Sequence, residues 1–135
     1  MNDGETISKF CVYTILHGNT LRAALGNGGR GVGKENHVWV TGKRLFDEAR
    51  RNGLRMPVIF AAAEDGPKGL LYYAMLETVE TDEPNQITNY SFAELTELPA
   101  RPPLSSLRKR SNGRPLSDDF IRPYSICYTP SFVEG

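Results

Sequence analysis

The sequence predicts one α+β domain whose short, mostly antiparallel strands close partly into a small barrel, with two or three helices packed on it. About six segments are rich in β-branched and aromatic residues, as strands are. Only two segments have helical periodicity, which is too sparse an alternation for a doubly wound parallel sheet. The 135 residues contain no internal repeat and no linker. We therefore expect a single domain over residues 1–135.

Strands and helices alternate in the first half of the chain. In order, we expect a strand at 9–16 (KFCVYTIL), a short helix at 20–25 (TLRAAL), a glycine-rich loop at 26–36, a strand at 37–41 (HVWVT) and a helix at 43–52. Asn19 is a suitable N-cap for the first helix. Leu45, Phe46 and Ala49 lie on one face of the second helix, and Gly53 follows as its C-terminal residue.

The second half of the sequence predicts strands joined by loops, with a single helical turn. They are expected at 57–63 (PVIFAAA), 70–80 (LLYYAMLETVE), 87–92 (ITNYSF) and 121–129 (IRPYSICYT). EDGPKG at 64–69 predicts a hairpin loop, and a proline-broken connection with a helical turn is expected at 93–107. A helix in place of the second half of 70–80 stays an alternative. Pro123 predicts an edge position or a bulge for the last strand.

The glycine-rich stretch GNGGRGVGKEN, residues 26–36, contains two partial nucleotide-binding motifs. From Gly28 it reads G-x-x-x-x-G-K, and from Gly26 it reads G-x-G-x-x-G. Both motifs need a strand before the loop and a helix after it, and here the expected order is reversed. Glu35 also stands where a P-loop has Ser or Thr. The stretch is therefore interpreted as a flexible connection, or as a loop whose Arg30 and Lys34 contact a nucleic-acid backbone.

No metal, cofactor or catalytic group is indicated. A metal site needs about four ligands at close spacing, and only His17, His37, Cys11 and Cys127 are present besides scattered acids. The acidic pairs are neighbours in sequence, so their side chains point in different directions. Two cysteines cannot crosslink a secreted scaffold, and the polar N-terminus is no secretory signal, which favours the cytoplasm. No apolar run is long enough to cross a membrane.

The net charge is zero, but the charges are distributed unevenly. Residues 69–100 contain six acids and no base, whereas residues 101–114 contain five bases and no acid. Such a distribution predicts a basic face that phosphate groups can contact, with an ordinary solvated surface as the alternative. Several strand segments carry aromatic residues, which either fill the core or hold an unstacked base.

Three stretches resemble the PUA-like superfamily, and within it the EVE domain. MPVIFAAAEDGPKGLLYYAMLETVETDEP (56–84) resembles the central hairpin of the family. FAELTELPARPPLSSLRKRSNGRPLS (92–117) resembles the helix and the L-x-x-L-R-x-x-x-R-L-S-like segment that follow it. IRPYSICYTPSF (121–132) lies where the closing strand of the family belongs.

The resemblance implies a PUA-like barrel that reads nucleic acid, because EVE and the related YTH domains hold a modified base in an aromatic pocket. The candidates for that pocket are Trp39, Phe60, Tyr72 and Tyr73. The candidates for phosphate contacts are Arg30, Lys34, Lys43, Arg44, Arg108, Lys109 and Arg110.

The predicted function is therefore non-catalytic binding of DNA or RNA, with a flipped, modified base in the pocket. Some EVE domains are fused to nucleases, so a nuclease is an expected partner. Two alternatives remain. One is a small amidohydrolase acting on a modified nucleoside, as in an ASCH relative, with a Lys or Glu of perturbed pKa in a pocket. The other is a protein-interaction module in which the acidic region 77–97 meets a basic partner, with an exposed apolar patch and no salt-sensitive nucleic-acid binding.

Overall fold

The computed structural model describes residues 7–62, 70–116 and 124–133. Two expectations lie outside the described residues. They are the loop at 64–69 and the beginning of the last strand at 121–123, which includes Pro123. The elements are β1 (Phe10–Leu16), α1 (Gly18–Gly26), β2 (Gly31–Glu35), α2 (Val40–Arg51), β3 (Pro57–Ala62), β4 (Tyr72–Asp82), β5 (Ile87–Glu97), the 3₁₀ turn η3 (Leu104–Ser106) and β6 (Tyr124–Tyr128). None of the described helices is long and apolar enough to cross a membrane.

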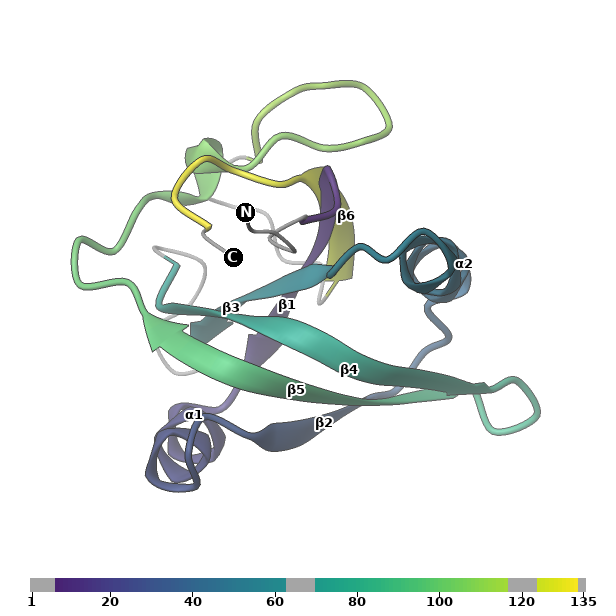
Figure 1. Ribbon diagram of the computed structural model, residues 1–135, viewed down its shortest axis with the longest axis horizontal. Coiled ribbons are helices and arrows are strands. Elements are labelled where there is room, and N and C mark those ends of the chain that lie inside the picture. The colour runs from purple at the N-terminus through teal and green to yellow at the C-terminus, as the bar shows by residue number, and fades with distance from the viewer. Residues whose placement is uncertain (1–6, 63–69, 117–123, 134–135) are drawn as a thin grey trace.

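The six strands form one mixed sheet in the order β2-β5-β4-β3-β1-β6 (Figure 1). β1 and β3 are parallel, and the other neighbouring strands are antiparallel. The α+β class and the mostly antiparallel sheet are confirmed. The predicted barrel closure is wrong, because β2 and β6 end the sheet without pairing with each other. The sheet is nevertheless curved, since the Thr14 hydroxyl on β1 hydrogen-bonds to the Glu35 carboxyl on β2, four strands away.

Each face of the sheet has its own hydrophobic core. The first core contains residues from both helices, including Leu21, Leu45 and Phe46, together with Trp39 and Phe60. The second core is covered by irregular segments instead, and its members there include Leu98, Leu104, Leu107, Leu116 and Val133. The proline-broken connection thus replaces a helical layer on that face.

The segment 37–41, expected to be a strand, is a short irregular connection whose last two residues already belong to α2. Trp39 is the N-cap residue, and the helix begins at Val40. The Trp39 amide donates to the Thr88 hydroxyl (2.9 Å), which in turn donates to the His37 carbonyl (2.8 Å). A tertiary anchor on β5 therefore overrides the local β propensity of these residues.

The glycine-rich stretch is a turn followed by a strand, so its interpretation as a loop is wrong. Gly28 and Gly29 have φ of 72° and 84°, as the turn after α1 requires. Gly31 and Gly33 lie on β2 opposite Phe92 and Tyr90 of β5. A Cβ at Gly33 would approach Tyr90 Cζ to 2.2 Å. These two glycines are needed because aromatic rings cover the edge strand, which accounts for one glycine in each of the two apparent nucleotide motifs.

The two cysteines lie opposite each other on neighbouring strands, Cys11 on β1 and Cys127 on β6. Both are buried free thiols. Burial raises the pKa of Cys127 to about 11 and that of Cys11 well above its usual range. The thiolate is the reactive form of cysteine, so this environment disfavours nucleophilic chemistry at either residue.

Candidate functional site

Two of the four expected pocket aromatics lie in a closed interior. Trp39 is 0% exposed and stacks between two tyrosines, Tyr90 at 4.7 Å and Tyr124 at 5.0 Å between ring centroids. Phe60 is also 0% exposed and lies against Tyr90 and Phe92. In this arrangement the ring faces of Trp39 are occupied by protein, so no space for a base lies next to them.

The other two expected aromatics are neighbours on β4, and they point to opposite faces of the sheet. Tyr73 belongs to the second core, whereas Tyr72 is half-buried and packs at the margin of the first. The four residues therefore do not meet in one pocket. Of the four, Tyr72 lines an open cavity.

A carboxyl group is buried beside the aromatic interior. Glu35 is 7% exposed, and burial raises its pKa to about 7, with partial compensation from the Thr14 hydroxyl. Burial also raises the pKa of Tyr90, and the neighbouring Glu35 adds to that shift. Trp39 Nε1 points toward the same carboxyl, yet neither Nε1 nor the Tyr90 hydroxyl has a hydrogen-bond partner among the described residues. This polar group lies in the core rather than in a cavity.

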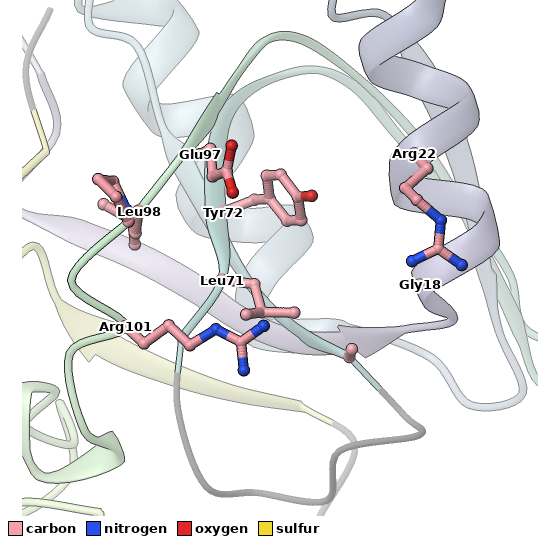
Figure 2. A pocket seen from close by; sticks show the side chains of 9 residues that line it. Gly18, Arg22, Leu71, Tyr72, Glu97, Leu98 and Arg101 are labelled. Carbon is pink, nitrogen blue, oxygen red and sulfur yellow. The ribbon is translucent and has the colours of Figure 1, made fainter.

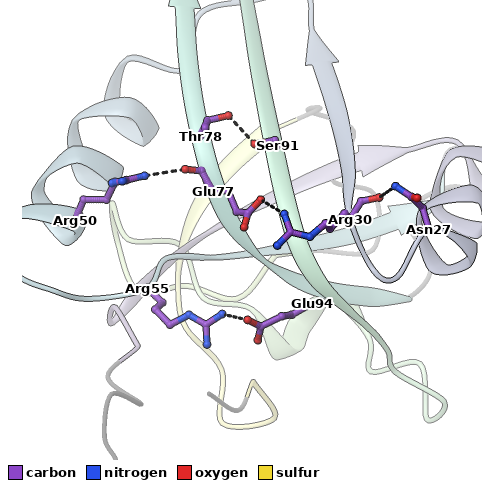
Figure 3. A network of polar contacts seen from close by, with 8 residues as sticks. All are labelled: Asn27, Arg30, Arg50, Arg55, Glu77, Thr78, Ser91 and Glu94. Atoms are coloured by element: carbon purple, nitrogen blue, oxygen red, sulfur yellow. Dashed lines mark hydrogen bonds and ion pairs between the residues drawn. The ribbon is translucent and has the colours of Figure 1, made fainter.

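Two of the expected phosphate contacts are engaged in ion pairs. Arg30 pairs with Glu77 (3.2 Å), whose carbonyl accepts from Arg50 (2.9 Å), as Figure 3 shows. Lys43 pairs with Asp47 one turn further along α2 (3.0 Å). Lys34 on β2 and Arg44 on α2 are exposed. These four residues come from β2, from α2 and from the connection before β2, and they are not gathered at one place.

The remaining three expected phosphate contacts run beside β6. The Arg110 amide donates to the Ile126 carbonyl (2.9 Å), and the Tyr128 amide donates to the Arg108 carbonyl (2.8 Å). The guanidinium of Arg110 lies over the Phe10 ring, 4.9 Å from its centroid. The segment 108–110 thus has a structural role as a partner of β6, and its contact with phosphate stays a prediction.

The best candidate site is a cavity of about 240 Å³ at the end of the sheet where α1 begins (Figure 2). Its lining consists of Gly18, Arg22, Ala62, Leu71, Tyr72, Glu97, Leu98, Pro99 and Arg101. In Figure 2 the guanidinium groups of Arg22 and Arg101 come from different segments on opposite sides, with Tyr72 and Glu97 on the strands between them. We call this site the end cavity.

The walls of the end cavity are fixed by backbone hydrogen bonds at the strand ends. Tyr72 faces Glu97 across the β4–β5 pair. The Leu98 amide donates to the Leu71 carbonyl (2.7 Å), and the Leu71 amide donates to the Phe60 carbonyl (2.8 Å). Arg101 ends a turn, since its amide donates to the Leu98 carbonyl (3.0 Å). Its φ of 46° is unusual for a residue with a Cβ, and such strained positions are concentrated at functional sites.

The chemistry of the end cavity combines an aromatic ring, two cations and one acid. Arg22 extends from the exposed face of α1 and donates to the Asn19 side chain one turn earlier. Arginines suit phosphate or carbonyl groups, a carboxylate accepts from amino groups, and a half-buried tyrosine offers a stacking surface. Among the described residues, no three His, Cys, Asp or Glu side chains are grouped so that they could hold a metal ion.

Sequence reasoning missed Arg22, Glu97 and Arg101. In the sequence, Arg101 belongs to the basic segment, Glu97 to the acidic segment and Arg22 to the first helix, and nothing in their spacing connects them. They meet because the ends of β4 and β5 and the start of α1 lie at one margin of the sheet. Their proximity follows from strand order, which the local pattern does not encode. No model of a known protein family matches the chain, and no curated protein is significantly similar to it.

Proposed function

We propose that this chain binds nucleic acid without catalysing a reaction, and that the end cavity holds one unstacked base. The observation that carries the proposal is the convergence of Arg22, Arg101 and the Tyr72 ring on one cavity. Single-stranded nucleic acids are bound in the same way elsewhere, with aromatic faces for the bases and cations for the backbone. The fold would then be a variant of the PUA-like domain in which the sheet stays open.

The size of the cavity favours a base over a larger ligand. At about 240 Å³ it is smaller than the roughly 300–1,000 Å³ typical of sites that enclose a whole drug-sized molecule. Glu97 accepts hydrogen bonds from an exocyclic amino group, and Leu71 and Leu98 offer an apolar wall for a methyl substituent. A modified base such as a methylated cytosine is therefore the ligand that we propose.

The alternative of an amidohydrolase has weaker support. It predicts a Lys or Glu of perturbed pKa in a pocket, and the described carboxyl whose pKa is clearly raised is Glu35. Glu35 is buried beside Thr14 and does not line the end cavity. The third alternative, an interaction module, finds support at a different place on the sheet, the free edge of β2.

The proposal is tested by fluorescence anisotropy of labelled single-stranded DNA and RNA that contain plain, methylated or hydroxymethylated cytosine. We expect Tyr72→Ala to weaken binding by about tenfold or more, since each stacked base contributes about 1–3 kcal/mol. Arg22→Ala is expected to weaken binding and to lower the slope of log K against log salt by about one. Both residues are at least partly exposed, so the variants should fold.

Arg51→Ala is the matched control, because Arg51 is an exposed arginine at the end of α2 and does not line the cavity. It should bind as the unaltered chain does. Equal affinity for all three variants and the unaltered chain would remove the end cavity from the proposal. No binding of any oligonucleotide by the unaltered chain would overturn nucleic-acid recognition for these ligands.

A further inference from the structure

The two edges of the sheet differ in how their backbone groups are used. At β6 the segment 108–110 covers the edge through hydrogen bonds to Ile126 and from Tyr128, and Lys109 forms a bridge with Cys127. At β2, which lies at one margin of the sheet in Figure 1, the pairing is with β5 alone. No described residue makes a backbone hydrogen bond to the outer side of Gly31–Glu35.

The free edge of β2 has only part of the usual protection against pairing. Natural edge strands are protected from another strand by prolines, bulges, short length or charged side chains, and of these β2 has its short length, Lys34 and the inward-pointing Glu35. β2 has no proline, its register with β5 is regular, and Lys34 is its one exposed charge. Val32 beside it is 70% exposed, the highest value among the large apolar side chains that the structure describes.

We propose that β2 pairs antiparallel with β2 of a second copy of this chain, around a two-fold axis at Gly33. The two sheets would then form one continuous sheet across the dimer. This proposal does not depend on nucleic-acid binding, because it uses neither the end cavity nor its residues.

The sequence of β2 is complementary to itself in this register. Gly33 would face the partner's Gly33, so no pair of side chains has to be accommodated at the axis. On the outer face, Val32 would lie opposite the partner's Lys34, whose aliphatic stem can cover it while the ammonium group stays in water. In this register, Lys34 therefore lies opposite a valine and not opposite the partner's Lys34. A shift of the axis to Lys34 would place two lysines face to face, which is unfavourable.

A second copy fits this edge better than an unrelated extended peptide. On the inner face of the edge, the rings of Tyr90 and Phe92 cover Gly33 and Gly31 and leave no room there for the side chains of a peptide. The cavity beside β2 lies on the outer face, where Val32 and Lys34 line it. Peptides added to a sheet edge gain their specificity from pockets for alternate side chains. A second β2 strand, with glycine at positions 31 and 33, can pair with this edge through its backbone and needs no such pockets.

The test is sedimentation velocity of the chain over a range of concentrations, with two variants on the exposed outer face. Val32→Lys places a lysine opposite the partner's Lys34 at two symmetric positions, and we expect the dimer dissociation constant to rise by about tenfold. The double variant Val32→Lys, Lys34→Glu places opposite charges there, and we expect it to restore the dimer. Circular dichroism should stay unchanged for both variants, and so should denaturant unfolding at concentrations where the chain is monomeric, since both side chains are exposed.

Three results would overturn the proposal. The first is an unaltered chain that stays monomeric at its highest soluble concentration, which would leave the edge to another partner or to none. The second is a dimer that Val32→Lys does not weaken. The third is a double variant that fails to recover the dimer, because the pairing centred on Gly33 requires that recovery.

Discussion

The aromatic interior around Trp39 and the end cavity around Tyr72 both contain aromatic rings on or beside strands, yet only one of them is accessible. Trp39 has a tyrosine on each ring face and is 0% exposed. Tyr72 is half-buried, with Arg22, Glu97 and Arg101 around the same cavity. The difference teaches that an accessible ring with exposed charged side chains around it, rather than the ring itself, distinguishes a candidate site from a core.

The largest effect in this comparison is expected when the Trp39 side chain in the aromatic interior is truncated. Trp39→Ala should lower the free energy of unfolding by about 3–5 kcal/mol, because it removes a fully buried indole from between two rings. Denaturant unfolding measures the change. Trp39→Phe, which keeps an aromatic ring, should cost less and leave oligonucleotide affinity unaltered. A selective loss of affinity in Trp39→Phe would mean that the interior opens to ligands.

The buried carboxyl makes stability depend on pH. Glu35 has a folded pKa of about 7 against an ordinary value of 4.5, so the unfolded chain releases its proton first as the pH rises. The contribution of the protonated Glu35 carboxyl to the free energy of unfolding is fully present below pH 4.5. It is lost as the pH rises through about 7, and the loss amounts to at most about 3 kcal/mol. Unfolding measured between these pH values checks this loss, and Glu35→Gln should flatten the profile. A profile that Glu35→Gln leaves unchanged would show that the carboxyl is not the cause.

The aromatic covering of β2 predicts a requirement for glycine. Gly33→Ala should lower the free energy of unfolding by about 1–3 kcal/mol, because the new Cβ would lie 2.2 Å from Cζ and 2.3 Å from the hydroxyl oxygen of the buried Tyr90. Gly26→Ala is the control, since its Cβ meets no atom within 4 Å. The two variants are compared by thermal or denaturant unfolding. Similar stability for both would contradict the packing of Tyr90 over β2.

The smallest effect is expected at Arg30, one of the predicted phosphate contacts. Its ion pair with Glu77 joins side chains that are 66% and 41% exposed, and such pairs contribute about 0–1 kcal/mol. Arg30→Ala should therefore change the free energy of unfolding by less than about 1 kcal/mol. It should also leave oligonucleotide anisotropy unaltered, because Arg30 does not line the end cavity. A clear loss of affinity would restore the glycine-rich stretch as a contact surface.

Local sequence patterns predicted most of the helices and strands but not the tertiary contacts between them. The segments around β1, α1, α2, β3, β4, β5 and β6 were expected from β-branched content and helical periodicity. The expected end of the fifth strand at residue 92 was wrong, because β5 continues to Glu97 in its pairing with β4. The strand expected at 37–41 failed because Trp39 is anchored through Thr88 on a distant strand. The glycine-rich strand was missed because Gly31 and Gly33 are explained by Phe92 and Tyr90, about sixty residues later. Barrel closure depended on long-range pairing, which periodicity does not determine.

The same limit explains the candidate site. Tyr72 was expected for its ring, whereas Arg22, Glu97 and Arg101 each looked like an ordinary surface charge. Their grouping requires the order of strands β3, β4 and β5 and the position of α1 at their ends. The resemblance to PUA-like domains suggested a nucleic-acid reader, but three of its four candidate pocket residues, Trp39, Phe60 and Tyr73, lie in the core.

The most direct test of the account is a map of backbone chemical-shift changes in the ¹⁵N-labelled chain during titration with a methylated single-stranded oligonucleotide. The account predicts that the largest changes occur at Gly18, Arg22, Leu71, Tyr72 and Leu98, with little change at Trp39 and its neighbours. Changes concentrated at Trp39, Tyr90 and Tyr124, with the end cavity unaffected, would contradict it. That result would place the ligand in the interior after all.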